Sequence, residues 1–405
     1  MTSDFPCPNC GKMGMSRFYE MSGAPVHSVQ LLQTREQAMS YPTGDIKLAV
    51  CHNCAFIANV AYDPQLQDYS LKYEATQSYS PTFNHFHRNL AQRLIDRFDL
   101  HNKEIIEIGC GHGEFLILLC DAGPNNGVGF DPAYDDTRIQ HEAKNRISFI
   151  ADYYSEKYAA IKGDFICCKM TLEHIPQTAE FLYTVRRSIG DNVDTTIFFQ
   201  IPNASYVLQD VAFWDVYYEH CSYFTKASLT NLFIQSGFDV LDVFTGYDEQ
   251  YLMIEARPVN GDAPERNIVA NTAQTLQQVS FFTQAVVQRL HGWHNLLNDL
   301  HVKEKKAVIW GSGSKGVAFL TTLNITSEIA YAVDINPHKH GTFMAGTGHE
   351  IVGPEFLRDY KPDIVIVMNP VYRDEIQDDL HKLGLQAELI MVDQSTETVG
   401  IEHDQ

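Results

Sequence analysis

The stretch from Ile105 to Asp131 constrains the fold of this chain more than any other. It opens with a β-branched apolar run, Ile105–Ile108, that is typical of a buried parallel strand. Three glycines at alternate positions follow the run: Gly109, Gly111 and Gly113. A helical pattern begins directly after them, and a second short strand leads to Asp131, about twenty residues beyond the glycines. Strand, glycine turn, helix, strand and acid form half of a nucleotide-binding crevice, so we expect a doubly wound α/β fold.

The acid at position 107 narrows the choice of ligand. A dinucleotide turn has the pattern G-x-G-x-x-G and directs helix amides at a pyrophosphate, which Glu107 would repel. An acid at this place instead attracts the ammonium group of an amino-acid moiety. The arrangement resembles motif I of class I S-adenosylmethionine-dependent methyltransferases. By this resemblance, Gly109 and Gly111 let the backbone approach the cofactor, and Asp131 holds the ribose hydroxyls. The alternative is a turn that uses glycine only for tightness.

The next strand along the chain, Ile147–Asp152, also ends in an acid. In the methyltransferase family an acid and an apolar neighbour at this place hold the adenine, which points to Asp152 and Tyr153. The complete predicted set of cofactor-binding residues is Glu107, Gly109, Cys110, Gly111, Gly113, Asp131, Asp152, Tyr153 and Lys169.

Near the N-terminus the chain carries two C-x-x-C pairs, Cys7 with Cys10 and Cys51 with Cys54. Two such pairs can supply four thiolates in a tetrahedron, the arrangement that zinc prefers. Four thiolates leave no open position, so the zinc would be structural. The alternative is a redox dithiol, which needs no second pair. We interpret His52 as a bystander and expect a β-rich module stapled by the metal.

The composition excludes several classes of function. The formal net charge of −21 opposes non-specific binding to nucleic acid. The sequence has no apolar run long enough to cross a membrane and lacks the start of a signal peptide, so we expect a cytoplasmic protein without a membrane partner. The sequence does not determine the oligomeric state.

The segment around position 174 resembles the family's fourth motif, whose residues lie under the transferring methyl. This makes His174 a candidate site residue, although a histidine here can also cap the next helix. Tyr73 and Tyr79 precede a helix that Ser80 should cap. They can cover the cofactor site, or simply pack between the zinc module and the core.

The segment Trp214–Thr225 is dense in ionisable and aromatic groups. Its Tyr-x-Glu-His cluster, Tyr217 to His220, offers a general base with an orienting carboxylate, Glu219, as proton abstraction next to a carbonyl requires. The alternative is an ordinary surface pair before the next helix.

The whole combination resembles the nucleotide-linked deoxysugar C-methyltransferases. The resemblance covers nearly the full chain: a four-cysteine zinc module, a methyltransferase core, Tyr-x-Glu-His-x-x-Tyr-Phe and a second α/β domain. It implies that His220 is the catalytic base, with Glu219 and Tyr217 beside it, and that His174 and Tyr73 are further active-site residues. One departure concerns the family's His-Gly-Gly-Ser stretch, because this chain has Asp-Glu-Gln-Tyr at 248–251.

The C-terminal part contains a second glycine turn, Gly311-x-Gly313-x-x-Gly316, with Asp334 after the next strand. Taken alone, this pattern indicates a nicotinamide dinucleotide. It is also compatible with docking of the nucleotide part of a sugar nucleotide, or with a turn that only packs. The predicted substrate-binding residues are Tyr79, Lys315, Tyr372 and Arg373.

We therefore expect four regions: a zinc-binding module (1–70), an S-adenosylmethionine-binding domain (71–257), a linker with a long helix (258–302) and a C-terminal Rossmann-like domain (303–405). The predicted activity is C-methylation of a nucleotide-activated keto-deoxysugar, a small-molecule substrate, with S-adenosylmethionine and structural zinc as cofactors. The alternatives are an O- or N-methyltransferase, a dehydrogenase that uses the C-terminal glycine turn, or a cofactor-binding protein without activity.

Overall fold

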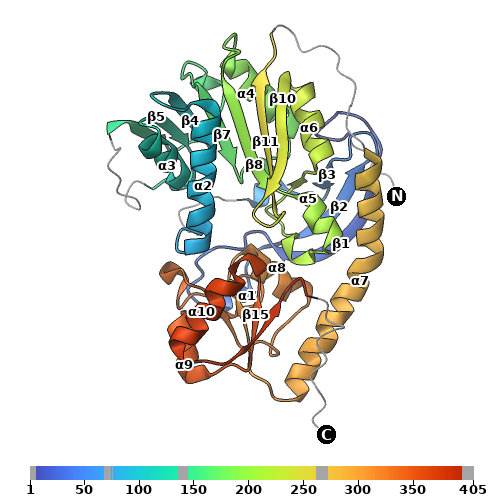
Figure 1. The fold of residues 1–405 in the computed structure, drawn as a ribbon. Coiled ribbons are helices and arrows are strands. Elements are labelled where there is room, and N and C mark those ends of the chain that lie inside the picture. Colours follow the sequence, from blue (N-terminus) through green and yellow to red (C-terminus); the bar gives the residue numbers. More distant parts are fainter. Residues whose placement is uncertain (1–5, 68–73, 75, 136–144, 261–271, 395–405) are drawn as a thin grey trace.

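The computed structural model describes residues 6–67, 74, 76–135, 145–260 and 272–394. Three β-sheets organise these residues, and helices cover the two larger sheets (Figure 1). The seven-stranded sheet lies at the top of the view and the five-stranded sheet at the bottom, while the four-stranded N-terminal sheet lies to one side. The α/β fold class is confirmed.

The seven-stranded sheet has the order β10-β11-β8-β7-β4-β5-β6. Its strands are β4 (Glu104–Ile108), β5 (Asn126–Phe130), β6 (Ile147–Ile150), β7 (Phe165–Lys169), β8 (Thr196–Pro202), β10 (Phe238–Gly246) and β11 (Tyr251–Pro258). The first five are parallel, and β11 runs antiparallel to both of its neighbours. Because the chain runs from β4 outward to β5 and β6 and then returns to β7, the strand order reverses between β4 and β7. This is the doubly wound core that the resemblance implied.

Helices α2 (Pro81–Phe98), α3 (Glu114–Ala122), α4 (Thr178–Ile189) and α6 (Lys226–Gln235) accompany this sheet. Helix α2 begins as predicted, because the Ser80 hydroxyl accepts a hydrogen bond from the Phe83 amide and Pro81 occupies the first turn. Glu375, from the C-terminal part of the chain, also accepts hydrogen bonds from the Ser80 hydroxyl and the Thr82 amide. An acid at a helix N-terminus is favourable, so this contact ties the two larger sheets together.

The N-terminal sheet has the order β1-β2-β3-β9. Strands β1 (Met15–Pro25), β2 (Thr43–Cys51) and β3 (Ile57–Asn59) come from the first part of the chain, whereas β9 (Ser222–Tyr223) comes from far along the sequence. Strand β9 pairs antiparallel with β3, Ile57 opposite Tyr223. The sheet therefore includes residues from outside the region 1–70 that the sequence suggested for the zinc module.

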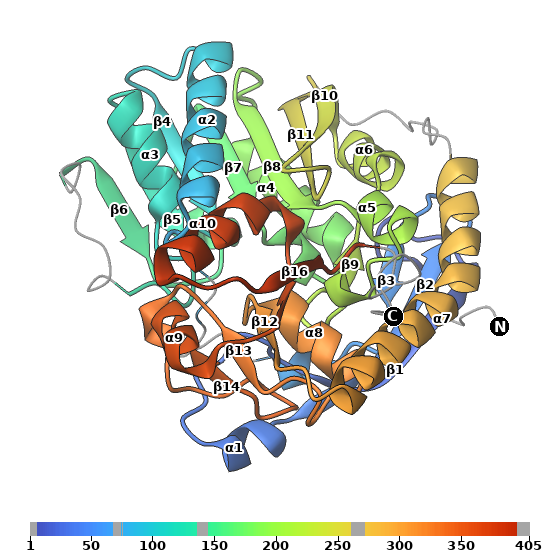
Figure 2. The same ribbon diagram turned by 60° about the horizontal axis from the view of Figure 1, so that its bottom comes forward.

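The five-stranded sheet is entirely parallel and has the order β14-β13-β12-β15-β16. Its elements are β12 (Ala307–Trp310), α8 (Ser314–Thr322), β13 (Tyr331–Val333), β14 (Glu350–Val352), α9 (Leu357–Tyr360), β15 (Ile364–Val367), α10 (Arg373–Leu383) and β16 (Glu388–Met391). The short helix α1 (Arg35–Met39) lies against this part of the chain, because the Gly346 amide donates to the Ala38 carbonyl (Figure 2).

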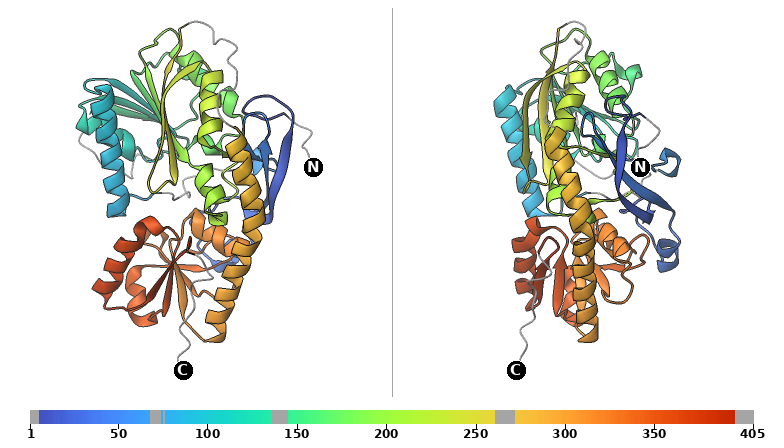
Figure 3. Two further views of the ribbon diagram at one scale, coloured as in Figure 1. Left: turned by 45° about the vertical axis from the view of Figure 1, so that its right-hand side comes forward. Right: turned by 90° about the vertical axis from the view of Figure 1, so that its right-hand side faces the viewer.

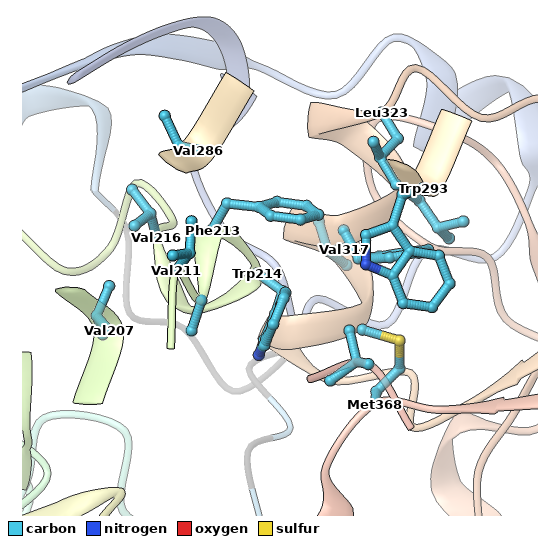
Figure 4. Close-up of a cluster of buried hydrophobic side chains, with 14 of the residues drawn as sticks. Val207, Val211, Phe213, Trp214, Val216, Val286, Trp293, Val317, Leu323 and Met368 are labelled. Atoms are coloured by element: carbon cyan, nitrogen blue, oxygen red, sulfur yellow. The ribbon is translucent and has the colours of Figure 1, made fainter. Parts of the chain in front are cut away.

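The long helix α7 (Thr272–Val302) runs beside all three sheets (Figure 3). Its buried face contributes Phe282 and Trp293 to one continuous core that also includes α8 and the segment after α5 (Ala204–Gln209). Figure 4 shows Phe213 and Trp214 of that segment among side chains of α7 and α8. This core holds the residues just before the Tyr-x-Glu-His cluster in place. Among the described residues, no helix combines the length and the apolar character that a membrane span requires.

We predict that Trp293→Ala destabilises the protein by about 3–5 kcal/mol, because the substitution leaves a cavity between α7 and α8. Trp293 is fully buried and meets the Phe319 ring edge-on at a centroid distance of 4.9 Å. Phe281→Ala, on the exposed face of the same helix, is the control and should change stability by no more than about 0.5 kcal/mol. Chemical denaturation followed by circular dichroism measures both, and equal losses would contradict the assignment of this core.

Candidate active site

The predicted cofactor turn lies where the strand order reverses, at the carboxyl end of β4. Gly109 has a φ of 70°, and a Cβ built on it would lie 2.0 Å from the Thr171 hydroxyl in the loop after β7. Only glycine therefore allows the two loops to approach this closely. The Asp131 carboxylate accepts hydrogen bonds from the amides of Gly111 and Ala133, each at 2.8 Å. Asp131 thus lies directly against the glycine turn.

Glu107 and Lys169 are both buried at the same edge of the sheet. Burial raises the pKa of Glu107 to about 8 and lowers the pKa of Lys169 to about 8, while the opposite charge of each group works against the shift of the other. Glu107 Oε2 has no hydrogen-bond partner among the described residues. A buried lysine and a buried acid beside the glycine turn can receive the two charged ends of an amino-acid moiety.

His87 of α2 lies beside Lys169 in the cofactor site, and the sequence analysis did not select it. Its Nε2 accepts a hydrogen bond from Lys169 Nζ at 2.9 Å. Burial and the nearby Lys169 charge lower the pKa of His87 to about 2, so the ring is neutral. The sequence could have indicated this residue, because His87 is a polar residue on the otherwise apolar face of the helix, between Phe83 and Leu90.

The two residues predicted for adenine, Asp152 and Tyr153, lie just beyond β6 and are more exposed. The Tyr153 side chain is 63% exposed, and Asp152 accepts hydrogen bonds from Lys157 and from the Tyr158 hydroxyl. The Lys157 ammonium is the main cause that lowers the pKa of Asp152 to about 2. Their predicted role stays a prediction.

Phe149, which the sequence analysis did not single out, fills the space beside the glycine turn. A Cβ on Gly113 would lie 2.4 Å from this ring, and Tyr134 stacks on it at a centroid distance of 4.2 Å. Cys110 is buried nearby, where burial raises the pKa of its thiol. The aromatic pair shapes the end of the turn next to Asp131.

The structure brings His174, His220 and Tyr217 together at the other end of the site. The two imidazole rings meet edge to face at a centroid distance of 5.0 Å, and the Tyr217 ring lies 4.1 Å from the His220 ring. Burial lowers the pKa of His174 to about 4, and burial, His174 and Lys315 lower that of His220 well below its usual value. Both imidazoles are therefore neutral at physiological pH. The alternative that His220 belongs to a surface pair is wrong, because this residue is 4% exposed.

Glu219 does not orient His220 as the sequence suggested. Its Oε1 accepts hydrogen bonds from the amide and the hydroxyl of Ser28, both at 2.8 Å, and lies 4.0 Å from His27 Nδ1. Its Oε2 has no hydrogen-bond partner among the residues that the structure describes. The expected contact fails because the segment after β1 reaches the carboxylate. Burial raises the pKa of Glu219 to about 7, although the Ser28 hydrogen bonds oppose this shift.

Glu173 is a further buried acid that the sequence analysis did not select. One of its carboxylate oxygens and one nitrogen each of His174 and His220 lie within 4.8 Å of one another. The sequence could have indicated Glu173, because it directly precedes His174 in the segment that resembles the family's fourth motif.

Three of the predicted substrate-binding residues lie in the C-terminal part, and the fourth, Tyr79, contacts this part through His338. Lys315 Nζ donates to Asp215 Oδ2 at 2.5 Å and to Gln250 at 3.1 Å, and the Tyr372 hydroxyl takes part in hydrogen bonds with Tyr247 and Gln77. The Tyr79 ring lies beside His338 and is 40% exposed. Arg373 lies at the start of α10, where its side chain is 63% exposed and pairs with the neighbouring Asp374. Tyr73 lies outside the described residues.

The second glycine turn does not present its acid to a ligand. Asp334 accepts hydrogen bonds from the Ser312 amide and hydroxyl and from Lys339 Nζ. A Cβ on Gly316 would lie 2.3 Å from the Gly311 carbonyl oxygen, so close packing requires that glycine, as it also does in dinucleotide-binding turns. The observation that argues against the dinucleotide interpretation is the Asp334 carboxylate, which Ser312 and Lys339 already occupy.

The four N-terminal cysteines form one cluster, as predicted. The sulfur atoms of Cys7 and Cys54 lie 3.7 Å apart, as do those of Cys10 and Cys51. A tetrahedral zinc ion with bonds of about 2.3 Å needs sulfur-to-sulfur distances of about 3.8 Å, so the four residues fit this ion. The ring of His52 instead makes a hydrogen bond with the Ser16 hydroxyl.

Comparisons with known proteins agree with this architecture. Residues 83–243 match a family described as a methyltransferase domain, and residues 263–391 match a family described as the C-methyltransferase C-terminal domain. C-methyltransferase NovU of Streptomyces niveus is 25% identical over 307 residues, which cover 72% of each chain.

Solved structures that resemble the chain include two methyltransferases. The first is the N,N-8-amino-8-demethyl-D-riboflavin dimethyltransferase RosA of Streptomyces davawensis, with 20% identity, a TM-score of 0.36 and coverage of 44% of this chain and 56% of that chain. The second is the magnesium protoporphyrin IX methyltransferase ChlM of Synechocystis PCC 6803 with bound SAH, with 15% identity, a TM-score of 0.35 and coverage of 44% and 84%.

We predict that Gly109→Ala weakens S-adenosylmethionine binding at least about tenfold, because the added methyl group would force the Thr171 loop away from the turn. Gly23→Ala is a matched control, since Gly23 has a φ of 72° but no atom within 4 Å of the added carbon. Isothermal titration calorimetry measures both affinities. Equal affinity for the two variants would contradict the prediction that the close approach of Gly109 to Thr171 matters for binding.

Proposed function

The chain belongs to the S-adenosylmethionine-dependent C-methyltransferases, and from this premise we propose that its acceptor is a keto-deoxysugar carried on a nucleotide. The observation that carries the proposal is a cluster of two neutral imidazoles, buried His220 and half-buried His174, with Tyr217 beside them. Methylation at carbon needs a base that removes a proton next to a carbonyl, whereas an oxygen or nitrogen acceptor needs only a weak base. The neutral imidazole of His220 can accept this proton, but its lowered pKa makes it a weaker base, so the site must also stabilise the imidazolium that forms.

In this proposal His220 takes the proton from the carbon next to the ketone. S-adenosylmethionine, when bound, supplies a methyl group that is already activated for attack by a carbanion. The protein must therefore generate the enolate, hold it in line and exclude water. His220 carries out the first task, and the buried surroundings of His220 help to exclude water.

The hydrogen-bond pattern indicates which group donates to the enolate oxygen. His174 Nδ1 lies 3.0 Å from the Glu219 carbonyl oxygen, which can only accept, so Nδ1 carries the proton. A neutral His174 therefore has a lone pair at Nε2 and cannot donate there. We assign the donor role to the Tyr217 hydroxyl and assign to His174 the task of holding the loop that contains Glu219 and His220.

Lys169 and Glu107 are assigned to the amino-acid end of the cofactor. Lys169 can meet the carboxylate and Glu107 the ammonium group, which explains why both groups tolerate burial. Asp131 would hold the ribose hydroxyls beside the glycine turn, and Asp152 and Tyr153 the adenine.

We assign the phosphates of the substrate to Lys315, which lies at the start of α8. The positive end of the helix and the ammonium group together favour an anion there, although the whole chain is strongly acidic. Tyr372 and Tyr79 would contact the sugar or the base, whereas Arg373, whose side chain is 63% exposed, would act only at the edge.

The four cysteines would hold a structural zinc ion. Residues of this cluster pack in one core with Phe56 and Phe224, whose rings lie 5.0 Å apart. Because β3 pairs with β9, the metal would also stabilise the strand that follows His220.

We predict that Cys51→Ser lowers both the zinc content and the activity, because loss of one thiolate opens the tetrahedron and loosens the β3–β9 pair. Zinc is measured by atomic emission and unfolding by calorimetry. Cys120→Ser is the control, since Cys120 is buried but lies outside the cluster, and it should keep one zinc per chain. A Cys51→Ser variant that retains stoichiometric zinc would contradict the proposed ligand set.

We predict that His220→Asn lowers turnover about 10²–10⁴-fold and leaves S-adenosylmethionine affinity unchanged, because the side chain removes a proton but does not bind the cofactor. His52→Asn, a change of the same kind in an exposed residue, should have no effect. Mass spectrometry with a panel of 4-keto sugar nucleotides measures turnover. Full activity of His220→Asn, or methylation of an analogue without a carbonyl, would instead favour an O- or N-methyltransferase.

A further inference from the structure

Glu173 is a buried acid to which the proposed mechanism gives no task. The residue is 1% exposed, and neither carboxylate oxygen has a hydrogen-bond partner among the described residues. A buried polar group without a partner destabilises the folded protein, so its presence requires an explanation. The acid lies in the loop after β7, one residue before His174.

The neighbours of Glu173 supply that explanation. Its carboxylate, one nitrogen of His174 and one nitrogen of His220 lie within 4.8 Å of one another. The other nearby acid, Glu219, has Oε1 bound to Ser28. Glu173 is therefore the carboxylate that faces the imidazole pair.

We propose that Glu173 is the positioning carboxylate of this site, and that in its ionised form it stabilises the imidazolium that forms when His220 takes the substrate proton. This proposal rests on the proposed function. In the step, the carbon–hydrogen bond breaks, an N–H bond forms on His220, and the electron pair remains in the enolate. The enolate carbon would then bond to the methyl group of the bound cofactor while the carbon–sulfur bond breaks, and S-adenosylhomocysteine would leave with the electron pair of that bond. The imidazolium later returns its proton to solvent, so Glu173 gains and loses nothing overall. Without a nearby negative charge, a cation on His220 would be costly in this buried site.

The charge state of the cluster then depends on pH. Burial raises the pKa of Glu173 to about 8, so the acid is neutral below that pH and ionised above it. The titratable groups that face this cluster from the surrounding elements are His27, Cys168, His174, Tyr217, Glu219, His220, Cys221, Tyr223, Tyr251 and Lys315. Burial keeps the cysteines, Tyr251 and both site imidazoles neutral between pH 6 and 9, which leaves Glu219 as the other acid that titrates in this range.

The first test needs no substrate. In the zinc-loaded full chain with ¹³C-labelled histidine, the resonances of His174 and His220 are assigned from His174→Gln and His220→Asn variants and followed from pH 6 to 9. The ionisation of a carboxylate so close to the rings should shift at least one resonance, with a midpoint near pH 8. Glu173→Gln, which keeps the shape of the neutral acid, should remove this inflection. Glu219→Gln should leave it in place.

The second test measures turnover with a sugar nucleotide from the panel that the unmodified protein methylates. The rate of the unmodified protein should rise with pH through about 8, because ionised Glu173 is the active form. Glu173→Gln should lose this rise and be at least about 10²-fold slower at pH 9, with unchanged S-adenosylmethionine affinity.

The two tests separate the possible failures. The proposal is overturned if the unmodified protein shows no inflection near pH 8, or if Glu173→Gln retains the inflection or the rate. If the inflection behaves as expected but no keto sugar nucleotide is methylated, the proposed function fails, and the catalytic task of Glu173 fails with it. If Glu219→Gln loses the inflection and Glu173→Gln retains it, Glu219 and not Glu173 is the carboxylate that stabilises the imidazolium.

Discussion

The site depends on one short segment, from Phe213 to Tyr223, that is held at three points. Trp214 is buried in the core formed with α7 and α8, Glu219 is bound by Ser28 from the N-terminal part, and Tyr223 pairs with Ile57 in the N-terminal sheet. Each contact joins residues far apart in the sequence. The segment has little regular structure of its own, so its conformation is a product of these three contacts. The position of His220 therefore reflects the assembly of the whole chain.

Burial also determines the electrostatics of the site. The chain carries a formal net charge of −21, yet desolvation raises the pKa of the acids near the imidazoles, that of Glu173 to about 8 and that of Glu219 to about 7. Ser28 connects this region to the C-terminal part, because its hydroxyl donates to Glu219 and lies 2.7 Å from the hydroxyl of Ser314 at the start of α8. A substrate that changes the contacts of α8 would thus act close to Glu219, the acid next to the proposed catalytic residue His220.

The sequence was sufficient for the features that depend on local patterns. The β-branched run and glycine turn predicted β4 and the start of α3, and Ser80 with Pro81 predicted the start of α2. The two C-x-x-C pairs predicted the four-cysteine cluster, because this spacing is typical of zinc ligands. The features that were missed depend on contacts across the chain. The hydrogen bond from Ser28 to Glu219 spans 191 positions and that from Lys169 to His87 spans 82, and no periodic pattern reports such pairs.

The C-terminal glycine turn shows why a motif must be interpreted through its contacts. A G-x-G-x-x-G pattern serves both a tight turn and close helix packing, and here Gly316 lies so close to the Gly311 carbonyl that packing alone demands glycine. The acid that would bind a ribose is already satisfied by Ser312 and Lys339. What the turn does present is the start of α8 with Lys315, whose ammonium group is paired with Asp215, two residues before Tyr217. An anion that binds Lys315 must compete with Asp215, so binding at this helix would act directly on the segment that carries His220, the proposed catalytic base.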